Sequence, residues 1–199
     1  MLLMVSLALL LSLGALAPPS SGDALKQPIE LVKPEVAAAR VAACGFKSVR
    51  PKFDDTQQED VVEVSKVASA SKEQLECVAR ASLQTHYYVT LPAPVEQTYQ
   101  TLYWQMSRER DKADAKAWLD KRGLLARLPL YDPKRSDEAT FARTLEKLCG
   151  PRATGSLKTM EEHSAGNLDE ETLWCLVNAA SASGYPLGFI GNEAYKRER

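Results

Sequence analysis

Four cysteines are the residues of this chain whose type and spacing most directly predict chemistry. Cys44 and Cys149 are each followed by a glycine. Cys77 and Cys175 each lie six residues after a residue that could cap a helix. Because no two of the four are close enough for a C-x-x-C redox motif or a zinc knuckle, the spacing favours structural disulfide bonds.

The pairing Cys44–Cys77 and Cys149–Cys175 is favoured, because each bond then joins the end of one helix to the next helix along the chain. Closing a loop of about 30 residues in this way contributes about 3–4 kcal/mol to stability. The crossed pairing, Cys44–Cys149 with Cys77–Cys175, remains compatible with two similar halves. In either case we expect no free thiol in the mature protein.

Two histidines, His86 and His163, restrict the enzymatic interpretations. The sequence contains no H-E-x-x-H motif for a zinc hydrolase and no G-x-S-x-G turn for an esterase. It also lacks a glycine-rich phosphate loop and a cofactor fingerprint, so we assign no catalytic residue, metal or cofactor. The alternative is a small secreted hydrolase in which His86 or His163 acts with a nearby carboxylate.

Five aromatic residues flank a proline-rich turn and form a candidate interaction surface. Tyrosine and tryptophan are favoured at interfaces because each combines a large apolar ring with a polar group. In the alternative interpretation, the tyrosines of the predicted helix form its buried stripe and one tyrosine before the turn faces the core. The candidate residues are Tyr87, Tyr88, Tyr99, Tyr103 and Trp104.

Residues 1–24 are predicted to form a signal peptide. Residues 2–17 carry no charged side chain and are rich in Leu and Ala. This run is shorter than the ~20 residues of a membrane-spanning helix, although an uncleaved anchor is the alternative. We expect cleavage after Ala17 or Ala24, a secreted or periplasmic protein, and no integral span beyond this segment.

The charge balance bears on the class of partner. The chain has 25 basic and 26 acidic residues, which argues against nucleic acid, because phosphate binding requires a basic excess. Residues 108–127 are mildly basic, with the alternating signs typical of an exposed helix. We therefore expect an exported non-enzymatic binding or inhibitor module in the cell envelope or extracellular space. Its expected partner is another exported protein or a glycan.

Local signals predict the elements of the first half. Pro34 and Gly45 bound an alanine-rich helix, since proline suits the first helical position and glycine the end. A capping box over residues 71–74 starts a second helix. Alternating and β-branched residues predict extended segments at residues 48–53, 60–67 and 86–91.

The second half gives similar signals after a longer helix. An apolar stripe predicts this helix over residues 95–119. Further helices are expected to begin near Ser136 and Asp169, and residues 185–190 are expected to form a short strand.

These elements predict a helix-rich α+β fold built from two pseudo-repeated modules. Each module has the order helix–helix–strand and is linked internally by a disulfide. The first module covers residues 25–93 and the second covers residues 134–199, with a connecting helix and loop in residues 94–133. Aligning Cys77 with Cys175 also places Tyr87 on Tyr185, which supports a duplication.

Overall fold

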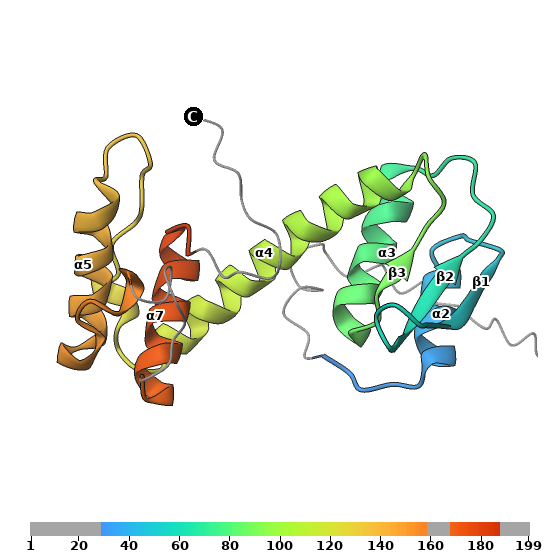
Figure 1. Ribbon diagram of the computed structural model, residues 1–199. Coiled ribbons are helices and arrows are strands. Elements are labelled where there is room, and N and C mark those ends of the chain that lie inside the picture. Colours follow the sequence, from blue (N-terminus) through green and yellow to red (C-terminus); the bar gives the residue numbers. More distant parts are fainter. Residues whose placement is uncertain (1–28, 159–167, 188–199) are drawn as a thin grey trace, which may run out of the picture.

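The computed structural model describes residues 29–158 and 168–187. Two packed units lie at the ends of one long helix, α4 (Glu96–Asp120), as Figure 1 shows. The first unit contains three strands and two further helices, and the second contains helices and short 3₁₀ turns. The fold is thus helix-rich with a small sheet, as the sequence predicts.

The first unit opens with α2 (Pro34–Ala42), which has proline in its first turn. The chain leaves this helix through Gly45, whose φ of 98° lies in the left-handed region that favours glycine. A Cβ atom at this position would lie only 2.8 Å from Nε2 of Gln74. The backbone conformation therefore favours glycine after Cys44, and a Cβ atom there would also displace the end of the Gln74 side chain.

Three strands form one sheet in the order β1-β2-β3. The strands are β1 (Val49–Asp54), β2 (Glu59–Val64) and β3 (Val89–Thr90). β1 pairs with β2 in antiparallel fashion, and β3 pairs with β2 in parallel. Because side chains alternate along a strand, Val62 and Val64 both point into the core while Glu63 points outward.

The edge strand β1 carries a proline that faces away from its partner strand. The hydrogen bond from Ser65 N to Ser48 O makes these two opposed residues a hydrogen-bonded pair. Since such pairs alternate in an antiparallel ladder, Pro51, opposite Val62, turns its nitrogen toward the open edge. This edge therefore lacks a donor in the middle of the strand.

Helix α3 (Lys72–Thr85) covers the sheet together with α2. Its N-terminus has the predicted capping box, in which Gln74 N donates to Ser71 Oγ at 3.2 Å and Ser71 N donates to Gln74 Oε1 at 3.0 Å. Its last turn ends at His86, which adopts a left-handed conformation with a φ of 65°.

The left-handed conformation of His86 leads to a testable prediction. Replacing His86 by glycine should raise the free energy of unfolding of the first unit by about 0.5–1 kcal/mol, because glycine adopts this conformation without the steric cost of a Cβ atom. His86→Ala is the matched control, since it removes the imidazole but keeps the Cβ atom. Chemical denaturation compares the two variants, and equal stabilities would contradict this account.

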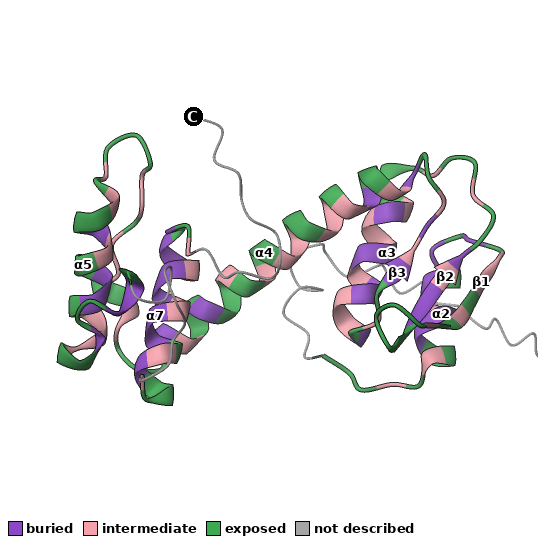
Figure 2. Cartoon of the chain, viewed as in Figure 1, coloured by how far each residue is buried: buried purple, intermediate pink, exposed green. Residues whose placement is uncertain are grey.

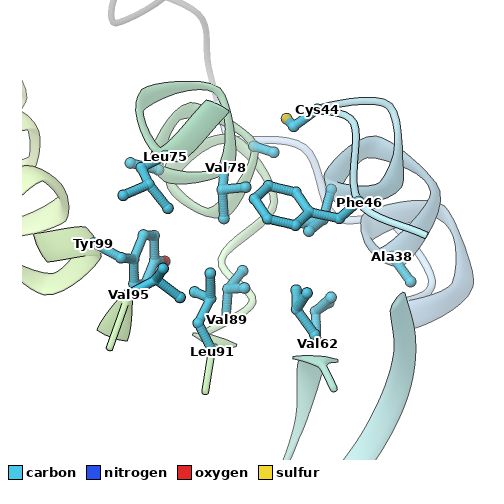
Figure 3. Packing of buried hydrophobic residues seen from close by; sticks show 14 of the residues in the cluster. Ala38, Cys44, Phe46, Val62, Leu75, Val78, Val89, Leu91, Val95 and Tyr99 are labelled. Carbon is cyan, nitrogen blue, oxygen red and sulfur yellow. The ribbon is translucent and has the colours of Figure 1, made fainter. Parts of the chain in front are cut away.

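The first core lies between the two helices and the sheet. Figure 3 shows Phe46, Leu75 and Val78 pointing toward the strand residues Val62 and Val89. Tyr99 and Val95 reach the same cluster from the start of α4 and the residue before it. The largest of these side chains are almost fully buried, and Figure 2 shows buried positions on the facing sides of these elements.

Helix α4 buries different sides at its two ends. Tyr99 near its beginning belongs to the first core, whereas Ala115 and Leu119 near its end belong to the second. At 100° per residue, Tyr99 and Ala115 point to sides of the helix about 160° apart. The two cores therefore lie on nearly opposite sides of one continuous helix.

In the second unit, α7 (Glu170–Ser183) packs against the end of α4, and α5 (Glu138–Cys149) packs against α7. Asp137 and Asp169 cap the two helices by accepting backbone N–H groups in their first turns. Glu146 is almost completely buried, with 5% of its surface exposed. Its carboxylate accepts N–H groups of Gly155 at 2.9 Å and Leu157 at 3.0 Å, so it holds the segment after α5 in place.

Two expectations about strands differ from the structure. The strand expected over residues 86–91 is restricted to Val89–Thr90, because His86 still belongs to the end of α3 and Pro92 follows. Residues 185–187 form no strand, since Pro186 lacks an N–H, and residues 188–190 lie outside the described part of the chain.

The two units also differ in the segment between their disulfide-linked helices. The first unit has the β1–β2 hairpin there, whereas the described residues between α5 and α7 include the 3₁₀ turn η2 (Pro151–Ala153) and no strand. The described residues thus do not show the repeated helix–helix–strand order.

Candidate interaction surface

The four cysteines form two disulfide bonds, Cys44–Cys77 and Cys149–Cys175, and none of them is free. This is the pairing that the sequence favoured. The first bond joins the end of α2 to α3, and the second joins the end of α5 to α7. Each bond therefore connects two packed helices within one unit, which is a structural role.

The histidines give no assembled catalytic group within the described ranges. His86 is exposed at the end of α3, and its imidazole makes no hydrogen bond or ion pair with another described residue. His163 lies outside the described residues. Among residues 29–158 and 168–187, no group of three or more His, Cys, Asp or Glu side chains could hold a metal ion.

Two of the five predicted aromatic residues stabilise the first core. Tyr99 is 2% exposed, and its hydroxyl is hydrogen-bonded to the side chain of Ser82. Burial raises the pKa of Tyr99 well above its usual value. Tyr87 packs against the same core and donates its hydroxyl to the carbonyl of Val32 at 3.0 Å. Neither ring is therefore available to a partner.

The other three form what we call the aromatic surface: Tyr88, Tyr103 and Trp104. Trp104 is 51% exposed and Tyr88 is 45% exposed. Tyr103 is partly buried beneath Trp104, with their rings edge to face and their centroids 5.2 Å apart. Desolvation raises the pKa of Tyr103, and the nearby Tyr88 and Asp111 add to this effect, so its phenol stays protonated at neutral pH.

A row of cations continues from the aromatic surface along α4. Arg108, Lys112 and Lys116 follow Trp104 at four-residue steps, and we call these three the basic row. Within the part of the chain that the structure describes, none of them makes an ion pair. Arg110 is different, because it donates to the carbonyl of Leu83 at 2.6 Å and pairs with Asp114 at 3.8 Å.

The acids in the middle of α4 face another part of the molecule. Asp111 and Asp114 line a hollow of ≈ 480 Å³ between α4 and α7, together with Asn178 and Ser181. Desolvation and the neighbouring charge of Asp114 raise the pKa of Asp111. Asp111 accepts a hydrogen bond from Ser107 Oγ and Asp114 pairs with Arg110, so neither carboxylate forms an ion pair with the basic row.

The sequence identified the aromatic group but only part of the surface around it. The i, i+4, i+8 spacing of the basic row was a usable signal, which the alternating charges in residues 108–127 obscured. Which cations lack a partner depends on the packing of α3 and α7 against α4, which no local pattern specifies.

No family model matches the chain, and no curated protein or solved structure is measurably similar to it. No helix in the described segments is both long enough and apolar enough to cross a membrane.

Proposed function

We propose that this chain is an exported, non-enzymatic binding module that docks another exported protein on its aromatic surface. The observation that carries the proposal is the exposure of Trp104, whose ring packs edge to face on the partly buried Tyr103, and of Tyr88, which is near enough to Tyr103 to raise its pKa. Exposed aromatic anchors of this kind dominate binding energy in protein interfaces, because large rigid rings bury much area at low entropic cost.

Two further features support this function. Two disulfide bonds fit an oxidising compartment outside the cytosol. The proline at the centre of edge strand β1 disfavours a partner that would add a strand to the sheet. A partner is therefore expected to contact side chains on α4 and its surroundings rather than the backbone at the β1 edge of the sheet.

Photo-crosslinking in the native host tests the proposal. A photoreactive amino acid placed at position 104 or 88 of the full chain should give a discrete crosslinked protein. Position 174 is the matched control, because Trp174 is 50% exposed on α7 of the second unit. Failure to crosslink a protein at 104 and 88, or an equal yield of the same adduct at 174, would refute the proposal. A crosslinked glycan would refute the protein partner.

The contribution of Trp104 can then be measured with the captured protein. Trp104→Ala should weaken binding at least about 30-fold, which is the lower bound for an interface hot spot. Trp174→Ala should leave the affinity unchanged. Biolayer interferometry measures both, and circular dichroism checks that the two exposed substitutions leave the fold intact.

A further inference from the structure

Building on the proposed function, we infer that the docked protein presents an acidic surface, which lies along α4 from Trp104 over the basic row. The aromatic surface supplies the apolar end of this contact, and Arg108, Lys112 and Lys116 supply its charge. The inference thus names the chemistry of the partner that the proposed function leaves open.

The spacing of these side chains gives one extended contact. Each four-residue step along a helix turns by only about 40°, so Trp104 and the basic row follow a single ridge. The ridge from Trp104 to Lys116 is about 18 Å long, at 1.5 Å per residue. Arg108 and Lys116 are exposed and Lys112 is partly exposed. The three steps from Trp104 to Lys116 turn by about 120° in total, so a partner segment that winds with the row can contact all four.

The charge of the ridge is not neutralised within the described residues. On the sheet, by contrast, Glu63 pairs with Arg50 at 2.7 Å and with Lys52 at 3.0 Å. The carboxylates of Asp111 and Asp114 face the hollow beside α7. Although the whole chain has a net charge of −1, this ridge carries three cations that form no ion pair with a carboxylate in residues 29–158 or 168–187.

The basic row and the exposed Trp104 together indicate the chemistry of the partner. Carboxylates placed over the basic row would gain favourable interactions, because no carboxylate of the described residues forms an ion pair with these three cations. An apolar side chain at one end of the acidic segment would pack on Trp104. Such complementarity mainly accelerates association and excludes basic partners, and its effect falls as salt screens the charges.

A defined peptide probe tests this inference directly. The probe is a fluorescein-labelled dodecapeptide with one phenylalanine followed by six glutamates spaced among alanines, and its control has glutamine in place of glutamate. Fluorescence anisotropy with the full chain should show binding of the glutamate peptide that weakens about tenfold between 20 and 300 mM NaCl. Binding of the glutamine peptide should be at least about tenfold weaker at low salt.

Charge reversal then locates the contact. The triple variant Arg108→Glu, Lys112→Glu and Lys116→Glu should weaken peptide binding at least about tenfold at 20 mM NaCl. The control triple variant Lys47→Glu, Lys66→Glu and Lys134→Glu changes the net charge equally. These lysines are exposed and form no ion pair with a described residue, so the variant should bind nearly as well as the parent.

Several outcomes overturn the inference. Two of them concern the peptides: the glutamate peptide does not bind, or the two peptides bind equally. The other two are equal losses of affinity in the two triple variants, and binding of a deoxythymidine dodecamer that is tighter than binding of the glutamate peptide. The photo-crosslink at position 104 separates the two proposals. If it persists unchanged in the basic-row triple variant, the acidic partner is excluded while the proposed function stands.

Discussion

Replacing Cys44 and Cys77 together by serine should lower the free energy of unfolding of the first unit by about 3–4 kcal/mol. The bond closes a loop with a sequence separation of 33 residues, so its loss lets the unfolded chain gain the entropy that closure removes. The double substitution avoids leaving a reactive thiol. Hydrogen exchange read by mass spectrometry measures the effect separately for each unit.

The second disulfide provides the internal control. In the Cys44→Ser and Cys77→Ser variant, protection of α5 and α7 should remain at the parent level, because their core and the Cys149–Cys175 bond are intact. An equal loss of protection in both units would contradict the account and would mean that the two cores unfold as one.

Replacing Glu146 by alanine should cost about 2–5 kcal/mol in the second unit. The carboxylate is the acceptor for backbone N–H groups of Gly155 and Leu157, and Leu157 is completely buried. Removing it takes a charge-assisted acceptor away from both groups and enlarges the open hollow that Glu146 already lines. Thermal or urea unfolding of the full chain reports the loss.

Two variants distinguish the hydrogen bonds from a general effect on α5. Glu146→Gln keeps one carbonyl oxygen and should lose roughly half as much stability. Lys147→Ala lies at the next position, is exposed, and should leave stability within about 0.5 kcal/mol of the parent. A loss for Lys147→Ala as large as that for Glu146→Ala would show that helix propensity, and not the acceptor, determines the result.

The helices of the first unit follow from short-range signals in the sequence. Ser71 and Gln74 satisfy each other's backbone groups across one turn, and this interaction needs no distant residue. Pro34 and Gly45 mark the two ends of their helical segment for equally local reasons. The alternation of Val62 and Val64 with Glu63 predicts the strand and its inner face.

Features that depend on contacts between distant segments could not be predicted from these local signals. β3 exists only where two residues meet β2 in a parallel pair, so its length depends on a contact between distant segments. In the sequence, Glu146 resembles any charged residue on the exposed face of a helix. In the structure, the turn after α5 folds back over it. Neither outcome is encoded within a window of a few residues.

The sequence predicted the five aromatic residues as one group, but it did not predict which of them are buried and which are exposed. The sequence could not say which of Tyr87 and Tyr88 faces the core, and the structure turns Tyr87 inward. Tyr99 and Tyr103 lie on the same side of α4, but the packing of α3 buries Tyr99 more completely. Trp104, the next residue along the helix, is left facing outward.

The number of residues in α4 determines how the two units are oriented about its axis. A single residue inserted between Ser107 and Ala113 would rotate one unit against the other by about 100° and separate them by about 1.5 Å. Seven inserted residues would restore the orientation to within about 20°. Helix length, more than the identity of its exposed side chains, therefore decides which faces of the two units look in the same direction.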